Sequence, residues 1–338
     1  MPGGGHGGQR RPRRARAGRR PPAVLSPPGR LVGVDLGGTK CLGVALEGGT
    51  PVAEHRVATP VGATAVLEAL AGTAAALGPA SAIGVGVPGL VDIAGVLRFA
   101  PNLAGVADLD VRGGLRARFP GVPVRVDNDA TAAGWAEVRA GAARGATEAV
   151  LVTLGTGIGG GVVAGGRVVR GAHGFAGEIG HMIVDPDGPP CPCGQRGCWE
   201  RVASGSALGL LARQEALARP GGRVAALAGG DPGAVRGEHA TTAAAEGDAA
   251  ALAVMEAFAR SVALGLVNLA NVFDPAVIVL GGGLVGAGRT LLDPVRRAFT
   301  EMVLGGAHRP PVAIVAAALG ERAGAIGAAL LAGAEPAP

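Results

Sequence analysis

Short apolar runs alternate with segments of helical spacing from Leu31 to the C-terminal end of the chain. The apolar runs are rich in Val, Ile and Leu and end in glycine turns, which is typical of buried strands. Strands that alternate with helices indicate layered α/β packing. The predicted strands cover residues 31–36, 82–92, 122–129 and 276–284 and a hairpin over 149–171, and the predicted helices cover residues 63–77, 130–142, 206–218, 242–271 and 323–333.

Two glycine-rich turns have similar surroundings, in "VGVDLGGTK" near residue 35 and in "LVTLGTGIGGG" near residue 155. Each turn follows an apolar run and precedes a second strand. This internal echo predicts two related domains, each opening with a strand–turn–strand hairpin. The stretch from Arg219 to His239 is rich in Gly, Ala and Pro, so we expect a loop with weak helix there.

The distribution of charge along the chain bears on which classes of partner the protein can bind. The 338 residues include 62 glycines and one lysine, Lys40, and the formal net charge is +5. Residues 1–30 carry eight arginines and no acid, so the rest of the chain holds 23 basic and 26 acidic groups. A mildly acidic folded part offers no broad surface for a phosphate backbone, and we therefore expect no nucleic-acid partner.

Residues 1–30 are rich in Gly, Pro and Arg without an apolar period, which predicts a disordered basic tail. A tether to nucleic acid and a start assigned too early both remain open for this tail. Its apolar run "AVL" is too short for an export signal. Gly, Pro or charge interrupts each later apolar run, so we expect no membrane span and a cytoplasmic protein.

Three glycine turns that follow predicted strands are candidate nucleotide sites: "DLGGTK", "LGTGIGGG" and "LGGGL". Glycine lets main-chain N–H groups approach an anion, although each turn alone is also typical of an ordinary tight turn. None of them has the P-loop or the dinucleotide fingerprint. Asp35, at a strand end, could hold a magnesium ion through water, and the hydroxyls of Thr39 and Thr156 could bond phosphate oxygens.

The stretch "VDND" at residues 126–129 places two carboxylates just before a predicted helix. A carboxylate in this position most often caps the helix, and we expect Asp127 to be that N-cap. Asp129 has two interpretations at this point. It is either a further capping residue or a general base that accepts a proton from an attacking hydroxyl.

One histidine and three of the four cysteines are spaced as H-x9-C-x-C-x4-C. Structural zinc sites take four N and S ligands, so this pattern predicts a zinc site. A disulfide is disfavoured by the lack of an export signal and by cysteines one residue apart, and a redox pair would have C-x-x-C spacing. A zinc-stapled loop would hold Glu178 and Glu200 as two arms of one binding site. The predicted ligands are His181, Cys191, Cys193 and Cys198.

Together these motifs resemble those of the ROK (repressor, open reading frame, kinase) family, which lies within the sugar kinase/actin superfamily. The resemblance covers Leu31 to Gly333 and is greatest to the glucose-phosphorylating bacterial members. It rests on "VGVDLGGTK", "GVGVPGLVD", "PNL", "VDNDA", "LGTGIGGG", "GEIGHM", "CPCGQRGCWE" and "VIVLGGGL". It implies two actin-like, ribonuclease H-like α/β domains around a cleft. The small domain would span residues 31–133, completed by a C-terminal helix at about 320–334, and the large domain with the zinc knot would span residues 134–319.

The resemblance implies ATP-dependent phosphorylation of the 6-hydroxyl of glucose, with Asp129 as the base and a magnesium ion on the phosphates. Sugar hydroxyls would be bound by Asn102, Asn128, Glu178, His181 and Glu200, and the zinc would be structural. The residues implied to meet phosphates or adenosine are Gly37, Gly38, Thr39, Thr156, Gly157, Gly281, Gly282 and Gly283.

Several alternatives stay open within the resemblance. Family members also use fructose, N-acetylglucosamine, N-acetylmannosamine or allose, and polyphosphate could replace or join ATP as the donor. A sugar-sensing repressor of the family would carry a winged helix-turn-helix ahead of the kinase-like part, whereas residues 1–30 show no helical apolar period. A non-catalytic sensor would have no need of an intact "DND". The resemblance also implies a homodimer or homotetramer.

Overall fold

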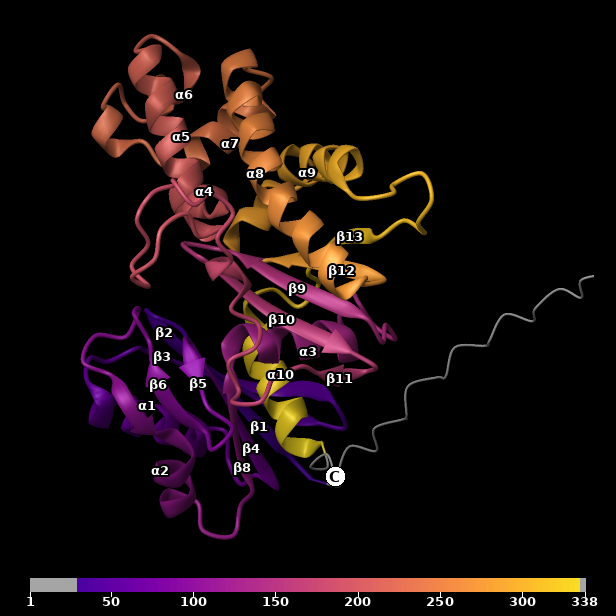
Figure 1. Ribbon diagram of the computed structural model, residues 1–338. Coiled ribbons are helices and arrows are strands. Elements are labelled where there is room, and N and C mark those ends of the chain that lie inside the picture. Colours follow the sequence, from indigo (N-terminus) through magenta and orange to yellow (C-terminus); the bar gives the residue numbers. More distant parts are fainter. Residues whose placement is uncertain (1–28, 335–338) are drawn as a thin grey trace, which may run out of the picture.

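Two five-stranded sheets form the frame of the computed structural model, which describes residues 29–334 (Figure 1). In the first sheet, β1, β2 and β3 are antiparallel, while β4 pairs in parallel with β1 and β8 in parallel with β4. The strand order is β3-β2-β1-β4-β8. The strands are β1 (Leu31–Leu36), β2 (Lys40–Glu47), β3 (Thr50–Ala58), β4 (Ala82–Val87) and β8 (Val124–Asn128).

The second sheet repeats this topology in the order β11-β10-β9-β12-β13. Strands β9, β10 and β11 are antiparallel, and β12 lies parallel to both β9 and β13. The matching order confirms the expected internal repeat and its two opening hairpins, β1–β2 and β9–β10. The strands are β9 (Ala149–Leu154), β10 (Ile158–Ala164), β11 (Arg167–Val168), β12 (Val277–Gly281) and β13 (Ala313–Ala316).

Two helices rich in small residues, α3 (Asp129–Ala140) and α10 (Ala323–Gly333), lie between the sheets (Figure 1). Helix α3 packs on β9 and β10, while α10 packs on β1, β4 and α3. A Cβ atom at Gly327 would lie 1.7 Å from the main-chain oxygen of Ala132. Only glycine permits so close an approach of two backbones. The C-terminal helix therefore completes the layer that covers the first sheet.

The outer face of each sheet carries its own helices. Helices α1 (Ala63–Ala76) and α2 (Val111–Arg118) share a core cluster with the first sheet. A small sheet of β5 (Leu90–Val91), β6 (Val96–Phe99) and β7 (Ala107–Asp110) extends this half. The short helix η4 (Gly320–Arg322) leads into α10. The other helices belong to the second half: η1 (Ile179–His181), α4 (Glu200–Ala203), α5 (Gly205–Ala218), α6 (Arg223–Leu227), η2 (Pro232–Ala234), α7 (Gly237–Ala245), α8 (Ala249–Phe273), η3 (Gly283–Ala287) and α9 (Arg289–Met302).

The observed helices differ from the predicted ones in several places, and three of these differences have a clear physical reason. The single helix predicted over residues 242–271 is two helices, α7 and α8. The first ends before Gly247, which has a φ of 89°, and the second begins after Asp248, whose side chain accepts a hydrogen bond from the N–H of Ala251. The expected loop from Arg219 to His239 contains α6, η2 and the start of α7. Helix α9 is not predicted, since Pro294 lies inside it and an interior proline normally marks a helix end.

Most of the expected basic tail, residues 1–28, lies outside the described residues. Arg30 is described, and its guanidinium donates hydrogen bonds to the Glu47 carboxylate and to the carbonyl oxygen of Leu77. Contrary to expectation, one described helix, α8, is long and apolar enough to cross a bilayer by length and composition. Half of that apolar window is buried, with Phe258 and Val262 in the core, so internal packing accounts for its composition.

Candidate active site

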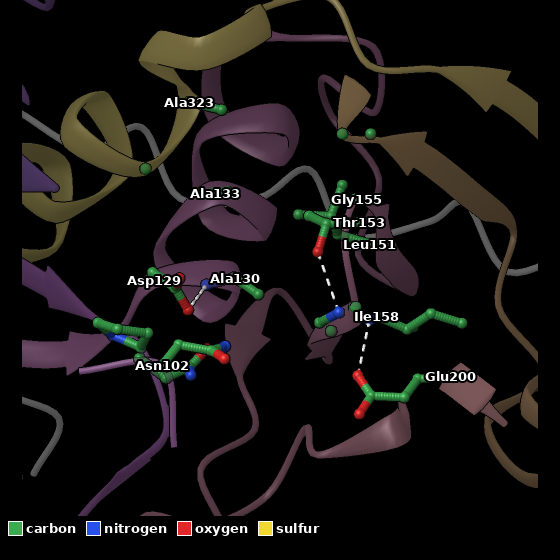
Figure 2. A pocket seen from close by; sticks show the side chains of 18 of the residues that line it. Asn102, Asp129, Ala130, Ala133, Leu151, Thr153, Gly155, Ile158, Glu200 and Ala323 are labelled. Atoms are coloured by element: carbon green, nitrogen blue, oxygen red, sulfur yellow. Dashed lines mark hydrogen bonds between the residues drawn. The ribbon is translucent and has the colours of Figure 1, made fainter. Parts of the chain in front are cut away.

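A cavity of about 1290 Å³ is lined by residues from both sheets, and we refer to it as the central cavity (Figure 2). Residues at the ends of several strands and at the start of α3 line this cavity. Most of the side chains predicted to be functional lie on its wall. The predicted residues among its lining are Asp35, Asn102, Asn128, Asp129, Gly157, Glu178, His181, Cys193, Glu200, Gly281, Gly282 and Gly283.

Asp129 is the first residue of α3, and its carboxylate lies at the wall of the central cavity (Figure 2). Its Oδ1 atom accepts a hydrogen bond of 2.7 Å from the N–H of Ala130. A negative charge is favoured at a helix N-terminus. The cap itself is Asn128, whose Oδ1 accepts a 3.0 Å hydrogen bond from the N–H of Thr131. The helix start therefore needs no further cap from Asp129.

The prediction that Asp127 caps this helix is wrong. Asp127 is only 7% exposed, and its Oδ2 accepts hydrogen bonds from Nε and Nη2 of Arg170 at 2.8 and 2.6 Å. Arg170 follows β11, so this ion pair joins the last strand of the first sheet to a segment of the second half. The Asp127 carboxylate therefore binds Arg170, 43 residues away in the chain, and not the N-terminus of the adjacent helix.

Asp35 and Asp129 form a half-buried acidic pair at the floor of the central cavity. A Cβ atom at Gly86 would lie 3.2 Å from the Cα of Asp129 and 3.5 Å from Oδ1 of Asp35. Burial, then repulsion from Asp129, raises the pKa of Asp35 to about 8, although Lys40 opposes the shift. Burial also raises the pKa of Asp129, against its main-chain hydrogen bonds. Two such carboxylates readily share a cation or a proton.

Glu178 and Glu200 face the same part of the cavity from different segments. Burial raises the pKa of Glu178, His181 lowers it, and the charges of Asp129 and Glu200 raise it further, which places all four groups close together. Glu200 is fixed by a 3.2 Å hydrogen bond from the N–H of Ile158 to its Oε2 (Figure 2). A Cβ atom at Gly157 would lie 2.4 Å from that oxygen, so a larger residue there would displace the Glu200 carboxylate. The predicted two arms of one site are therefore neighbours in space.

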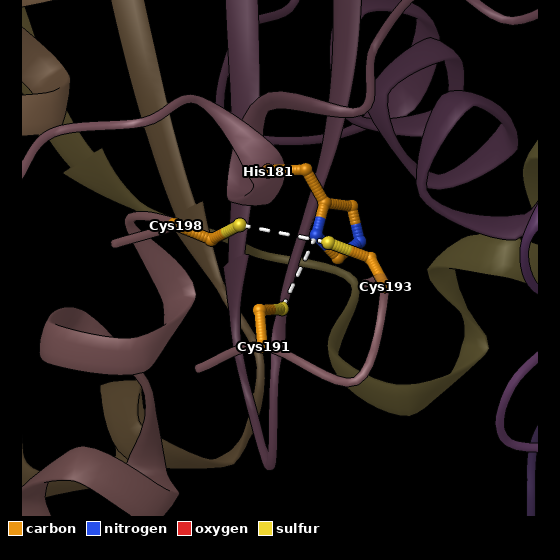
Figure 3. Close-up of side chains that lie close together, drawn as sticks. All are labelled: His181, Cys191, Cys193 and Cys198. Carbon is orange, nitrogen blue, oxygen red and sulfur yellow. Dashed lines mark hydrogen bonds between the residues drawn. The ribbon is translucent and has the colours of Figure 1, made fainter. Parts of the chain in front are cut away.

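The four predicted zinc ligands lie together (Figure 3). Their donor atoms are all within 4.8 Å of one another. The Sγ atoms of Cys193 and Cys198 are 3.6 Å apart, and Sγ of Cys191 is 3.8 Å from Nδ1 of His181. A tetrahedral zinc ion with bonds near 2.3 Å to sulfur sets its ligand atoms about 3.8 Å apart. All four cysteines of the chain are free thiols, so this donor set fits zinc.

The glycine turns take different positions relative to the cavity. Gly157 and the turn of Gly281, Gly282 and Gly283 line it. Gly282 has a φ of 84°, and a Cβ atom there would lie 2.4 Å from the carbonyl oxygen of Leu154, so the turn requires glycine. Four of the predicted nucleotide contacts are not among the lining: Gly37, Gly38, Thr39 and Thr156. The β1–β2 turn lies beside the cavity, since a Cβ atom at Gly38 would be 3.6 Å from the main-chain oxygen of Asn102.

Several residues of the cavity wall carry no signal that the sequence analysis used. Glu137 is fully buried, and its carboxylate accepts hydrogen bonds from the N–H groups of Ala142, Ala318 and Leu319. It thereby joins α3 to the segment ahead of η4. Its contacts with Ala318 and Leu319 are 181 and 182 residues away, and no local pattern encodes them. The other polar residues that the prediction missed are Lys40, Thr153, Gln195 and Glu321.

Comparisons with known proteins agree on one family. The model of the ROK family matches residues 31–335. Glucokinase of Streptomyces coelicolor is 40% identical over 311 residues, which cover 90% of this chain and 98% of that protein. Glucokinase of Thermotoga maritima is 35% identical over 307 residues, which cover 89% and 96%.

A solved structure has the same fold. It is a ROK family glucokinase from Streptomyces griseus in complex with glucose and AMPPNP, with 39% sequence identity and a TM-score of 0.80. The match covers 90% of this chain and 99% of that one.

Proposed function

Because this chain belongs to the ROK family, we propose that it is a glucokinase that transfers the γ-phosphoryl group of ATP to the 6-hydroxyl of glucose, with Asp129 as general base. The assignment to ATP-dependent hexose kinases rests on full-length relatives of that activity. The observation that carries the proposed mechanism is the Asp129 carboxylate, which lies on the cavity wall and is spared the capping role by Asn128.

Asp129 accepts the proton of the attacking hydroxyl in this mechanism. A general base works best when its pKa approaches the working pH, and burial raises the pKa of Asp129 toward that range. Phosphoryl transfer otherwise needs positioning and charge neutralisation more than covalent chemistry. The two halves that enclose the cavity would exclude water, which competes with the sugar for the phosphoryl group.

The sugar would lie between Asp129 and the zinc-bearing loop. Glu178, Glu200 and His181 would accept or donate hydrogen bonds to hydroxyls near the anomeric carbon. Asn128 uses its Oδ1 for the cap and donates one Nδ2 hydrogen to the carbonyl oxygen of Gly89 at 3.3 Å, which leaves its second Nδ2 hydrogen for a ring hydroxyl. Asn102, which also lines the cavity, would bind a further hydroxyl.

The nucleotide would lie along the glycine turns. The turn residues Gly37 and Gly38, the N–H of Gly157, and the hydroxyls of Thr39 and Thr156 would meet the phosphates. Gly281, Gly282 and Gly283 would lie along the adenosine. Asp35 is suited to hold magnesium, because its charge is otherwise disfavoured beside Asp129. Magnesium supplies neutralisation of phosphate charge in this class of reaction.

His181, Cys191, Cys193 and Cys198 would hold a structural zinc ion, which supplies rigidity and no chemical step. His181 faces the cysteines with Nδ1, so its Nε2 is the ring nitrogen left for the sugar. The remaining parts of the proposal follow from the family resemblance and from the charge of the chain. They are a homodimer or homotetramer, a cytoplasmic location, and no nucleic-acid or membrane partner.

The decisive experiment for the reaction is a panel of phosphoryl acceptors and donors with the purified full chain. We expect glucose to give the highest kcat/KM against fructose, allose, N-acetylglucosamine and N-acetylmannosamine, and ATP to exceed polyphosphate as donor. A higher kcat/KM for another hexose would replace glucose as the substrate. Failure to transfer to any sugar from either donor would overturn the proposed function.

A further inference from the structure

Lys40 lies at the wall of the central cavity, at the first position of β2, directly after the β1–β2 turn. It is the only lysine of the chain. Its charge reaches the acidic pair at the floor, because Lys40 lowers the pKa of Asp35 against burial and Asp129. The sequence predicts no role for Lys40, although Lys40 belongs to the first glycine turn motif.

The charged side chains that line the cavity are mostly acidic. Among the described residues that line it, Lys40 is the only lysine or arginine. A nucleoside triphosphate that enters this space therefore finds one permanent cation on the wall besides the metal that accompanies it. Phosphoryl transfer depends on such neutralisation. The acidic residues of the lining are Asp35, Asp129, Glu137, Glu178, Glu200 and Glu321.

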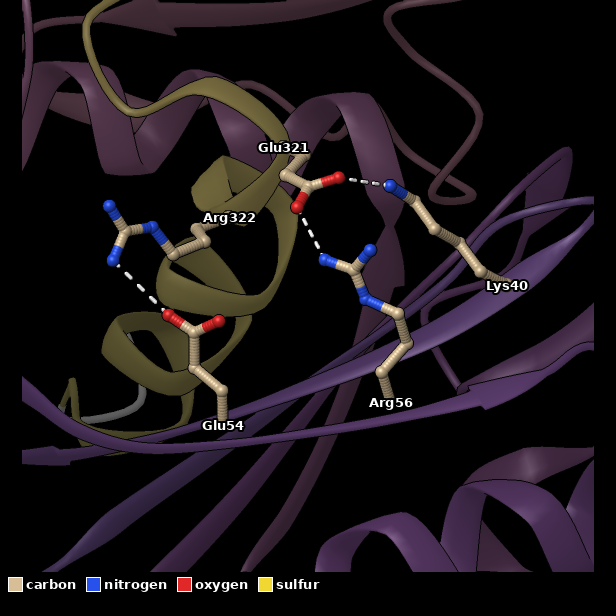
Figure 4. A network of polar contacts seen from close by, with 5 residues as sticks. All are labelled: Lys40, Glu54, Arg56, Glu321 and Arg322. Carbon is tan, nitrogen blue, oxygen red and sulfur yellow. Dashed lines mark hydrogen bonds and ion pairs between the residues drawn. The ribbon is translucent and has the colours of Figure 1, made fainter.

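In this structure, the Lys40 ammonium is paired with Glu321 (Figure 4). Glu321 lies in η4, at the start of α10, and also lines the cavity. Its Oε2 contacts Lys40 and its Oε1 contacts Arg56 of β3, so each carboxylate oxygen has its own cation. These two contacts lower the pKa of Glu321 to about 2, the bond with Lys40 contributing most.

The Lys40–Glu321 pair is open to exchange. The two side chains are 41% and 51% exposed. An ion pair this accessible is weak, because water screens it and two long side chains lose freedom in forming it. A triphosphate offers a denser negative charge than one carboxylate, and Arg56 keeps Glu321 paired if Lys40 leaves.

We propose that Lys40 is a ligand of the nucleotide phosphates and that Glu321 is its replaceable counter-ion, which the triphosphate displaces on binding. This inference rests on the proposed kinase function and adds a residue to its donor site. Glu321 would hold the ammonium at the cavity wall before ATP arrives and would keep Arg56 as its partner afterwards.

A neighbouring ion pair provides a matched control. Arg322 Nη1 lies 3.1 Å from Oε1 of Glu54, and the pair joins the same two elements, η4 and β3, as the contact between Glu321 and Arg56 (Figure 4). Its side chains are 51% and 41% exposed, the same degree as in the Lys40 pair. Neither residue lines the central cavity.

The direct test is acetylation of the full chain with limiting acetic anhydride, followed by mass spectrometry of the Lys40 peptide. Lys40 carries the only side-chain amine, so the readout is unambiguous. Saturating Mg·AMPPNP should reduce labelling by about tenfold, because an ammonium bonded to phosphate is a poor nucleophile. Adenosine, which lacks phosphates, should leave the labelling unchanged. Equal labelling of Lys40 with and without Mg·AMPPNP would overturn the proposal.

Kinetics separates the two roles. Lys40→Met should raise the KM for ATP by about 10- to 100-fold, the usual loss for a charge-assisted hydrogen bond, and leave the glucose KM unchanged. Glu321→Gln should lower the ATP KM by about two- to fivefold, which is what a surface ion pair is worth, whereas Glu54→Gln should not change it. A raised ATP KM in Glu321→Gln would show that Glu321 positions Lys40 and is not displaced. If Lys40→Met does not fold, Lys40→Gln is the second variant, and an unchanged ATP KM in that variant would contradict the contact, since a neutral amide does not neutralise phosphate charge.

The labelling experiment is independent of turnover. A chain that phosphorylates no hexose, but whose Lys40 is protected by Mg·AMPPNP, would fail the proposed function and still support this phosphate contact. An active kinase whose Lys40 is not protected would do the reverse.

Discussion

The Sγ atom of Cys191 lies 3.6 Å from Oε1 of Glu200, while Oε2 of the same carboxylate accepts the hydrogen bond from Ile158. One side chain of the proposed sugar site is thus in direct contact with a member of the cysteine cluster. Residues in contact with metal ligands are oriented by them, and their function depends on the integrity of the site. The metal cluster and the sugar site should therefore fail together.

We expect Cys193→Ser to lose zinc and to raise the glucose KM by about tenfold or more, the usual range for disturbed surroundings of a metal site. Metal analysis of the parent protein should find about one zinc per chain, as four tetrahedral ligands require. Cys41→Ala is the control, because Cys41 is buried in β2 and contacts Thr73 instead. An unchanged glucose KM in verified zinc-free protein would contradict the bracing role.

The ion pair of Asp127 and Arg170 should stabilise the contact between the two halves of the molecule. Arg170→Gln leaves Asp127 buried without its ion-pair partner, and we expect the free energy of unfolding to fall by about 1–3 kcal/mol. This is less than for a fully buried pair, because Arg170 is partly exposed. Urea denaturation of both single variants and the double variant measures the coupling. Additive losses would show that the pair contributes nothing beyond its separate residues.

Asp35 should make the stability of the unliganded protein fall as the pH rises. Its pKa is about 8 in the folded chain against an ordinary value of 3.8, so between these values the unfolded chain holds fewer protons than the folded one. Asp35→Asn removes this effect. The variant should have a higher Tm than the parent at pH 8, and the difference should shrink toward pH 5, while kinase activity is lost. Parallel Tm curves for the two proteins between pH 5 and 8 would contradict the pKa shift.

Much of the architecture is predictable because glycine turns and apolar strands are local signals. The strand–turn–strand repeats predicted near residues 35 and 155 are present as β1–β2 and β9–β10. The actin-like α/β fold and the resemblance to ROK glucokinases are confirmed by the family match and by the Streptomyces griseus structure. The four residues of the predicted zinc motif also lie together in the structure, since short loops have few ways to fold.

The features that could not be predicted from the sequence all depend on contacts between distant segments of the chain. The choice of Asn128 over Asp127 as cap depends on Arg170, which takes Asp127 away from the helix terminus. Glu137 lies in an ordinary helical period, and only its contacts with Ala318 and Leu319 distinguish it. The pairing of Lys40 with Glu321 spans 281 residues and follows from the return of α10 to the first sheet.

If Asp129 removes the proton from the 6-hydroxyl, Asp129→Asn should lower kcat. Asparagine keeps the shape of the side chain and caps helices about as well as aspartate, so folding should be unaffected. Stability should not fall, because the change removes a charge that repels Asp35. The control is Asp110→Asn, since Asp110 is a true N-cap that accepts a 2.8 Å hydrogen bond from Gly113 in α2 and lies outside the cavity lining.

The measurement is steady-state phosphorylation of glucose by the parent, Asp129→Asn and Asp110→Asn, each checked for folding by its Tm. We predict that Asp129→Asn folds and keeps the glucose KM within a few-fold, but turns over at least about 100-fold more slowly, the lower end of the contribution of a general base. Asp110→Asn should keep the parent kcat. A folded Asp129→Asn protein whose kcat stays within a few-fold of the parent would contradict the assignment of Asp129 as the base.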